Sequence, residues 1–413
     1  MARPSAKRAN RLSHIELAQV VRAHQDFLLA RPGGVRAQLI HFDLSGMLIT
    51  GSNLKDADLT GANLSEADLS DCVLDGALLF GANLAEANLE GARLIGADLR
   101  GANLRGAVLR NANLQKADFR DGSITTRGKG GNLTSLTMKL GATTIENADL
   151  SGADLKGADL TSAVATHTDF TDADLQGAIL VHANLRGATL AGAMLDGAKL
   201  DHADLSGANL TDAVFGSAST ENTSFDGCDL SSVLTDQSRG RSFRELDPPV
   251  EQAITGHMQW VASDGAIGTP LVLDGVDMRG GPSFRDAALP ALSAEGAILM
   301  GLDFTRATLV GARLKGADLR NCCFKGADLR GSNLEGAKLN GADLRDAKLG
   351  RLKSGDKSYP TNLRSALLRR SDLRGADMRG AALNAADLTD AMLFKTRLDD
   401  CDLTDAKIAN SKG

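Results

Sequence analysis

The sequence contains few aromatic residues. Phenylalanine, tryptophan and tyrosine make up 3% of its 413 residues, with a single tryptophan and a single tyrosine. Large rings normally supply much of the apolar area of a thick globular core, so this composition favours a narrow core of leucine and alanine. No apolar run approaches the ~20 residues of a membrane-spanning helix. The basic start, MARPSAKRANRLSHIEL, lacks the apolar stretch of a secretory signal, so we expect a cytoplasmic protein without a membrane segment.

Recognisable catalytic motifs are also absent from the sequence. It has no nucleophile elbow, no zinc signature, no dinucleotide fingerprint and no spaced pair of carboxylates with a partner base. The five cysteines follow no metal-binding or disulfide spacing. Because a free cysteine packs as a small apolar residue, we interpret them as buried thiols. The sequence thus predicts a protein that is not an enzyme, with no catalytic residue, cofactor or metal ion.

The most abundant pattern in the sequence is a period of five. Every fifth residue from Leu44 to Ile124 is Leu, Ile or Phe, and similar runs cover residues 140–230, 299–349 and 363–408. Alanine usually stands two residues before the large one, and Asp or Asn directly before it. Helices repeat every 3.6 residues and strands every 2, so neither explains this period.

A square coil does explain a period of five. If the large residue and the alanine point inward, five residues form one side, and four such units close a coil of twenty residues. Stacked coils pair their backbones at the strand spacing of about 4.8 Å. Residues twenty apart then share one column, which places Leu64, Leu84 and Leu104 together inside the tube and stacks Phe304 on Phe324.

The consensus A-(D/N)-L-X-X, over about residues 42–235 and 295–410, closely resembles that of the pentapeptide-repeat family. The resemblance implies an all-β solenoid, specifically a right-handed quadrilateral β-helix, whereas the period itself gives no handedness. Some members of that family are quinolone-resistance proteins that mimic DNA and bind DNA gyrase. The resemblance to those members is more distant.

Breaks in the pattern divide the chain into two stacks with short capping helices. We predict a basic tail and a capping helix in residues 1–38, a first stack in 39–238, a linker with a second capping helix in 239–298, and a second stack in 299–413. The open end of a solenoid presents apolar side chains and unpaired strand edges. The helices are therefore expected to cover the ends of the stacks.

Both predicted helices have start signals. Ser13 and Glu16 have the spacing of a capping box. Asp247 is followed by two prolines and is the predicted N-cap of the second helix. Trp260 lies near the end of that helix and is predicted to be one of its capping residues.

The two helical segments resemble each other. HQDF at residues 24–27 aligns with HMQW at residues 257–260, which indicates a duplicated module of a helix leading into a stack. His24 and His257 occupy the same relative position, beside aromatic residues. We interpret both histidines as packing and hydrogen-bonding residues of the caps rather than catalytic groups.

Two loops interrupt the stacks, at residues 125–139 and 350–362. Both contain basic residues, and a long loop that leaves a regular array is often functional. The GKGG segment of the first loop lacks the spacing of a phosphate-binding loop. Lys129 and Lys353 are the candidate contact residues of the two loops.

Charge is unevenly distributed along the chain. Residues 140–238 contain 15 acidic and 3 basic side chains, whereas residues 299–413 contain 15 acidic and 21 basic ones. At the strand spacing, the acidic segment has about one net negative charge per 2 Å of rod, which approaches the ~1.7 Å of duplex DNA. The candidate contact residues of this segment are Asp149, Asp154, Asp159, Asp174 and Asp204.

These features favour a non-enzymatic scaffold that binds protein partners, and they leave self-association open. The alternative is a DNA mimic that binds DNA gyrase or another topoisomerase and modulates quinolone susceptibility. The scarcity of aromatic residues argues against direct nucleic-acid binding. His182 and His202 stand one coil apart, at a spacing where two imidazoles can share a metal ion. Two exposed polar side chains on a solvated face are the simpler interpretation.

Overall fold

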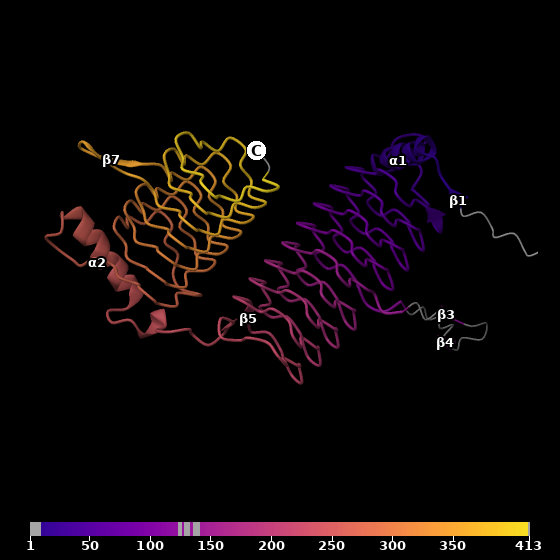
Figure 1. The fold of residues 1–413 in the computed structure, drawn as a ribbon, viewed down its shortest axis with the longest axis horizontal. Coiled ribbons are helices and arrows are strands. Elements are labelled where there is room, and N and C mark those ends of the chain that lie inside the picture. Colours follow the sequence, from indigo (N-terminus) through magenta and orange to yellow (C-terminus); the bar gives the residue numbers. More distant parts are fainter. Residues whose placement is uncertain (1–9, 123–125, 128–132, 135–140, 412–413) are drawn as a thin grey trace, which may run out of the picture. The chain divides into compact units, whose positions relative to one another are not determined.

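In the computed structural model, the described residues are 10–122, 126–127, 133–134 and 141–411. The chain divides into two compact units, Met1–Gln237 and Ser238–Gly413. Each unit has its own apolar core and consists of a helix followed by a stack of coils (Figure 1).

Parallel backbone pairing between residues twenty apart joins the coils. Four bridges leave the first coil, from Gln38, Asp43, Leu48 and Asn53 to Asp58, Asn63, Asp68 and Val73. On the next coil, the Leu64 amide donates to the Asn83 carbonyl at 2.6 Å. Four bridges thus join these successive coils, and the chain is a β-solenoid. The right-handedness that the resemblance implies stays a prediction.

The polar residues of the consensus build the corners between these sides. In most repeats the second residue after the leucine has a left-handed φ, for example 62° at Gly61 and 58° at Asp56. Glycine adopts this conformation freely, and Asn and Asp tolerate it. The Asp or Asn before the leucine accepts a hydrogen bond from the amide two residues later, as Asp58 does from Thr60 at 3.1 Å.

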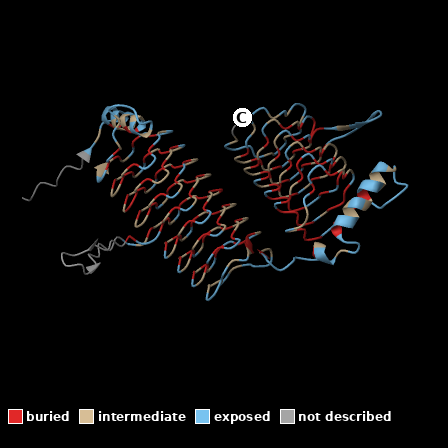
Figure 2. Cartoon of the chain, turned by 180° about the vertical axis from the view of Figure 1, so that it is seen from behind, coloured by how far each residue is buried: buried red, intermediate tan, exposed pale blue. Residues whose placement is uncertain are grey.

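Leucine and alanine fill the inside of the coils. Buried residues, in red, recur along the coils of both units (Figure 2). Leu64, Leu84 and Leu104 have exposed fractions of 0% and belong to one core cluster. The residues before them are bridged from coil to coil, so the three leucines stand in register on successive coils. Alanine fits beside them because a larger side chain would overfill so narrow a tube.

A ladder of phenylalanine rings replaces leucine in one column of the second unit. The ring centroids of Phe284 and Phe304 are 4.9 Å apart, and those of Phe304 and Phe324 are 5.0 Å apart. The planes differ by 4° and 9°. Phe284 extends the pair expected from the sequence by one further coil.

The coils of the second unit begin earlier than predicted. Val272 is already bridged to Ser293, a step of 21 residues instead of twenty. The extra residue lies in the turn around Gly281 and shifts the frame of five. That shift hides the repeat in the sequence, so the predicted linker of 239–298 is too long at its C-terminal end.

Helix α1 (His14–Leu28) covers the start of the first stack. Ser13 is its N-cap: the Ser13 hydroxyl accepts from the Glu16 amide at 3.3 Å, and the Glu16 carboxylate accepts from the Ser13 amide at 2.8 Å. Leu17 is part of the core cluster, and Val20 packs against it. The helix thus closes the apolar axis at this end.

Helix α2 (Val250–Ala262) covers the start of the second stack, where Val250 joins the core. The prediction that Asp247 is the N-cap is wrong, because the N-cap is Pro249 and no side chain caps the helix. A residue that precedes a proline is driven out of the helical region. Pro248 therefore stays outside the helix, and Asp247 lies too far from the first turn to cap it.

Short strands mark the ends of the first stack. β1 (Asn10–Arg11) pairs in parallel with β2 (Phe42–Asp43), and β5 (Val214–Gly216) pairs in parallel with β6 (Leu234–Thr235). A 3₁₀ helix, η1 (Phe243–Glu245), precedes α2. No described helix combines the length and apolar character needed to cross a lipid bilayer.

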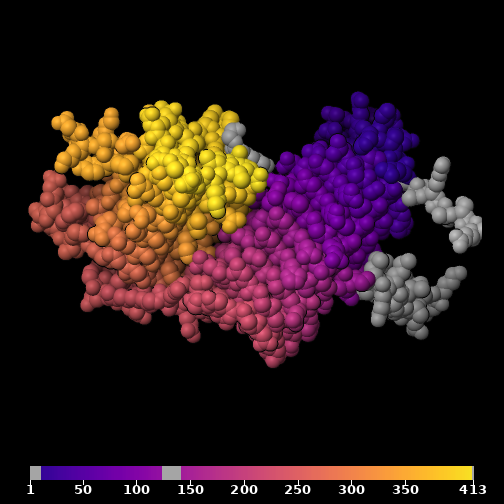
Figure 3. All heavy atoms as spheres, viewed as in Figure 1, coloured from indigo at the N-terminus to yellow at the C-terminus, as the bar shows by residue number. Residues whose placement is uncertain are grey.

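Two antiparallel hairpins leave the coils, one in each predicted loop. β3 (Thr126–Arg127) pairs with β4 (Leu133–Thr134), and β7 (Leu352–Ser354) pairs with β8 (Lys357–Tyr359). The second hairpin stands out from its unit as the orange projection in Figure 3. Lys129 lies outside the described residues.

Candidate interaction surfaces

A buried histidine fastens α1 to the first coil. The His24 ring is fully buried; its Nδ1 accepts from the Ala37 amide at 3.1 Å, and its Nε2 is 2.9 Å from the Lys55 carbonyl oxygen. Because Nδ1 accepts, the proton of the neutral ring must be on Nε2, where it reaches the carbonyl. Burial lowers the pKa of His24, which favours this neutral form.

His257 has the corresponding position in the second unit, where it binds α2 to the first coil. Its ring is fully buried, and Nδ1 accepts from the Leu271 amide at 2.8 Å. Nε2 is buried beside the Pro290 carbonyl but outside hydrogen-bonding geometry. Burial lowers the pKa of His257 as well. Trp260 packs its ring 5.5 Å from the His257 ring, so it supports the cap through the histidine.

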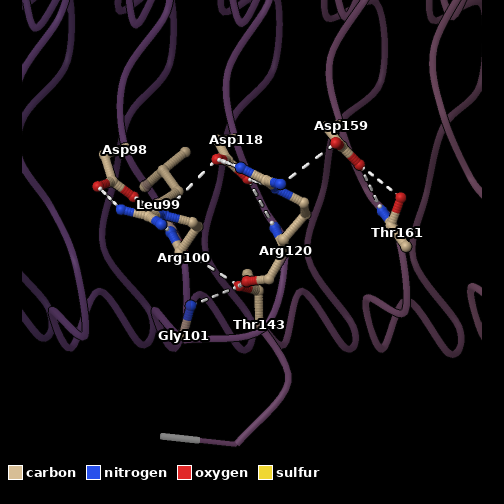
Figure 4. Close-up of polar contacts among 9 residues, drawn as sticks. All are labelled: Asp98, Leu99, Arg100, Gly101, Asp118, Arg120, Thr143, Asp159 and Thr161. Atoms are coloured by element: carbon tan, nitrogen blue, oxygen red, sulfur yellow. Dashed lines mark hydrogen bonds and ion pairs between the residues drawn. The ribbon is translucent and has the colours of Figure 1, made fainter. Parts of the chain in front are cut away.

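A buried threonine anchors each hairpin where the chain re-enters the coils. The Thr143 hydroxyl accepts from the Gly101 amide at 2.8 Å and donates to the Arg120 carbonyl at 2.7 Å (Figure 4). Thr361 has the same role, with the Gly331 amide at 3.0 Å and the Gly350 carbonyl at 2.9 Å. Each hydroxyl thus forms hydrogen bonds with one backbone amide and one backbone carbonyl at the point where the hairpin interrupts the coil.

We expect Thr361→Val to lower the free energy of unfolding of the second unit by about 1–3 kcal/mol, because it leaves a buried amide and a buried carbonyl without a partner. Thr361→Ser keeps the hydroxyl and is the matched control. Urea unfolding followed by the fluorescence of Trp260, which lies in the same unit, measures both. Equal stability of the valine and serine variants would contradict the anchoring role.

Arginine and aspartate alternate along one face of the first stack (Figure 4). Arg100 binds Asp98 through two nitrogens, at 2.8 and 2.7 Å, and lies 3.6 Å from Asp118 on the next coil. Arg120 binds Asp118 in the same way and lies 3.5 Å from Asp159. Burial acts to raise the pKa of Asp118, but the hydrogen bonds and charge of Arg120 outweigh it and lower the pKa.

The five predicted contact aspartates all have local partners. Asp149 lies 3.5 Å from Arg110, Asp154 2.7 Å from Gln115, Asp159 3.5 Å from Arg120, Asp174 2.6 Å from Lys156 and Asp204 3.2 Å from Arg186. In each case the residue after the large apolar residue of the repeat reaches the aspartate on the same side of the next coil. The charges of Asp149, Asp159, Asp174 and Asp204 are therefore compensated within the stack. Asp154 only accepts a hydrogen bond from the neutral Gln115 amide.

The sequence reading missed an uncompensated group of carboxylates further along the first unit. We call it the acidic end, and it comprises Asp196, Asp201, Glu221, Asp226, Asp229 and Asp236. None of them has a described Arg or Lys within ion-pairing distance, although His202 and Lys199 are near enough to contribute to the lowered pKa of Asp201. The preceding coil has no Arg or Lys at the positions that would reach them. Once the coil length of twenty is known, the absence of these basic residues can be found in the sequence.

Neutral donors hold part of the acidic end in its ionised form. The Ser219 hydroxyl and the Glu221 amide both donate to Asp201, and these hydrogen bonds lower the pKa of Asp201. Donation from the Ser231 amide lowers the pKa of Asp229 in the same way. Hydrogen bonds to a carboxylate favour its charged form, so these donors stabilise the charge on Asp201 and Asp229.

His182 and His202 stack in successive coils, with ring centroids 4.9 Å apart and planes 18° apart. In the described part of the chain, no group of three or more His, Cys, Asp or Glu side chains is placed to hold a metal ion. The pair thus lacks a third protein ligand.

The cysteines at alanine positions face the inside of the coils. Cys72 and Cys322 are buried, and each thiol donates to a backbone carbonyl at 3.0 Å. Burial raises the pKa of Cys72 to about 11 and also raises that of Cys322. A thiol with a raised pKa is a poor nucleophile at neutral pH.

Twenty-residue coils built from five-residue units define the protein as a repeat solenoid. The family model described as Pentapeptide repeats matches the chain in eight copies, at residues 36–76, 82–121, 140–177, 168–207, 297–336, 312–351, 361–400 and 371–410. These matches cover more than half of the sequence. The chain belongs to the pentapeptide-repeat family.

Several solved structures resemble this chain. HetL, a pentapeptide repeat protein involved in heterocyst differentiation regulation in the cyanobacterium Nostoc sp. strain PCC 7120, is 25% identical, with 78% of this chain and 87% of HetL covered and a TM-score of 0.17. QnrB1, a plasmid-mediated fluoroquinolone resistance protein, is 22% identical, with 49% and 92% covered and a TM-score of 0.29. Rfr23 from the cyanobacterium Cyanothece 51142 is 29% identical, with 32% and 91% covered and a TM-score of 0.22. No curated protein sequence matches the chain.

Proposed function

We propose that the protein is a non-enzymatic scaffold of the cytoplasm that binds a basic surface of a protein partner through the acidic end. The observation that carries this proposal is that Asp196, Glu221, Asp226, Asp229 and Asp236 are exposed and have no described cationic partner. A rigid face of uncompensated charge attracts a partner of opposite charge and sets its orientation.

A second copy of the chain has suitable chemistry, since its residues 299–413 contain more basic than acidic side chains. Self-association is therefore one form that the proposed contact can take, and an unrelated basic protein is the other. Sedimentation of the purified chain at low and high salt separates these two forms, because exposed charges attract each other less as salt screens them.

Affinity capture from the native lysate tests the proposal. The triple variant Glu221→Gln, Asp226→Asn and Asp229→Asn removes three charges from the acidic end, and we expect it to lose the partner. The matched control, Asp149→Asn, Asp159→Asn and Asp174→Asn, removes three compensated charges and is expected to retain it. Retention of the partner by both triple variants would overturn the proposal.

The alternative is a DNA mimic that binds DNA gyrase and modulates quinolone susceptibility. Its support is the acidic composition of residues 140–238. However, the pairing of Asp149, Asp154 and Asp159 with side chains of the preceding coil leaves the surplus charge at one end of the unit, whereas a mimic of duplex DNA needs a continuous row. A gyrase supercoiling assay with and without a quinolone tests this alternative, and no effect of the protein would remove it.

A further inference from the structure

A hollow of about 620 Å³ lies at the base of the β7–β8 hairpin, within the second unit. Five cations line it, namely Arg330, Lys348, Arg351, Lys353 and Arg379. Three carboxylates also line it, those of Asp346, Asp377 and Asp400. The lining thus has a surplus of two positive charges, and its volume is in the range of small-molecule sites.

The hollow exists because a glycine interrupts a column of arginines. Asp328, Lys348 and Asp377 are bridged in successive coils, so the residues two further on, Arg330, Gly350 and Arg379, also stand above one another. Arg330 and Arg379 project from the wall, while Gly350 between them has no side chain. A Cβ at Gly350 would come within 3.1 Å of the Arg379 carbonyl oxygen.

The cations around this gap differ in their partners. Arg330 is bound to Asp328, with contacts of 2.8 and 2.6 Å, and Arg379 is bound to Asp377, with contacts of 2.8 and 2.7 Å. In contrast, no described carboxylate lies within ion-pairing distance of Lys348, Arg351 or Lys353. These three cations are thus not bound to a carboxylate, although Asp346 and Asp400 line the same hollow.

Both the coil and the hairpin hold these cations in place. The Arg351 side chain lies across Gly380, where any Cβ would overlap it. Lys353 is paired with Ser358 across the hairpin. Because successive side chains of a strand point to opposite faces, the Lys353 side chain is on the opposite face from Leu352, which packs on Gly331. The hairpin thus adds a lysine to a site that the coils alone would leave open.

We propose that this hollow binds a phosphate monoester, with the phosphate between Arg351 and Lys353. A phosphate monoester has a charge of about −1.5 to −2 at neutral pH and three acceptor oxygens, which suits the donors of Arg351 and Lys353, neither of which is bound to a carboxylate. Asp346 and Asp400 also line the hollow, and carboxylates can accept hydrogen bonds from hydroxyl or amide groups of the organic part. This site is separate from the acidic end and does not depend on the proposed partner contact.

Calorimetric titration of the full chain tests the proposal, with inorganic phosphate, phosphoserine and a nucleoside monophosphate as probes. Serine and the free nucleoside are the unphosphorylated controls. We expect saturable binding of the phosphorylated probes only. Tighter binding of phosphoserine identifies a phosphorylated side chain as the source, tighter binding of the nucleotide identifies a nucleotide, and equal binding of all three shows that the phosphate alone is recognised. Absence of saturable binding at millimolar concentrations overturns the proposal.

Variants at the hollow sharpen the test. Arg351→Ala and Lys353→Ala should each weaken binding about tenfold or more, since each removes a charge-assisted hydrogen bond. Lys357→Ala, on the other face of the same hairpin, should leave binding unchanged. Gly350→Arg adds a positive charge but fills the gap, and we expect it to abolish binding. If that variant does not fold, the two alanine variants decide the question. Equal affinity of Arg351→Ala, Lys353→Ala and Lys357→Ala, or tighter binding by a folded Gly350→Arg, contradicts the site.

Discussion

Replacing Phe304 by alanine is expected to lower the free energy of unfolding of the second unit by about 3–5 kcal/mol. Phe304 is buried between Phe284 and Phe324, with centroid distances of 4.9 and 5.0 Å. The substitution removes the middle ring of the ladder and leaves a cavity that the two rigid coils on either side cannot fill. Since each coil of a solenoid is stabilised chiefly by its neighbours, loss of the Phe304 ring weakens the packing of its coil against both neighbouring coils.

Phe304→Leu is the matched control, because leucine is the usual residue at this position of the repeat. We expect it to cost less than about 1.5 kcal/mol, as an exchange of two large apolar residues. Trp260, the single tryptophan, lies in the same unit, so urea unfolding followed by its fluorescence compares the two variants. If alanine is tolerated as well as leucine, the stacked phenylalanines contribute little to stability.

Replacing His24 by alanine is expected to cost about 3 kcal/mol at the N-terminal cap. The substitution leaves the Ala37 amide and the Lys55 carbonyl, now bonded to His24 at 3.1 and 2.9 Å, without partners inside the protein. Each such buried group costs about 1–3 kcal/mol. Hydrogen exchange at the Ala37 amide measures the loss directly. His41→Asn is the control, because His41 is exposed and has a left-handed φ of 58° that asparagine tolerates.

Acid should weaken the same cap. The native pKa of His24 is lowered by burial, whereas a histidine in the unfolded chain titrates near 6.5. Below about pH 6.5 the unfolded state therefore binds more protons than the native state, and the free energy of unfolding falls as the pH falls. The slope is about 1.4 kcal/mol per pH unit for one histidine until the native pKa is reached.

The slope between pH 6.5 and 5 distinguishes this effect from the titration of carboxylates, whose lowered pKa values place their contribution at lower pH. Protection of the Ala37 amide at pH 7.5 and pH 5.5 gives the measurement. The His24→Ala variant should lose this pH dependence, and the His41→Asn variant should retain it. A pH-independent cap in the unmodified chain would show that the ring is not held in its neutral form.

Which aspartates have a cationic partner could not be predicted from the sequence. Asp159 looks like any other aspartate of the repeat, yet Arg120 reaches it from the preceding coil at 3.5 Å, across an inserted loop. Asp226 and Asp229, further along, have no such partner. All three aspartates lie in the same acidic segment, residues 140–238, so composition does not distinguish them. Only the register of neighbouring coils decides which carboxylate is compensated.

The sequence by itself determined the architecture, because a period of five constrains every residue locally: one apolar residue and one alanine inside, and polar residues at the corner. This was enough to place Leu64, Leu84 and Leu104 inside the coils, and the capping-box spacing of Ser13 and Glu16 was enough to expect a helix after Ser13. The tertiary structure alone decided the start of the second stack, the failure of Asp247 as a cap, and the hollow beside Gly350. These features depend on contacts between residues a whole coil or more apart, and a single inserted residue is enough to change them.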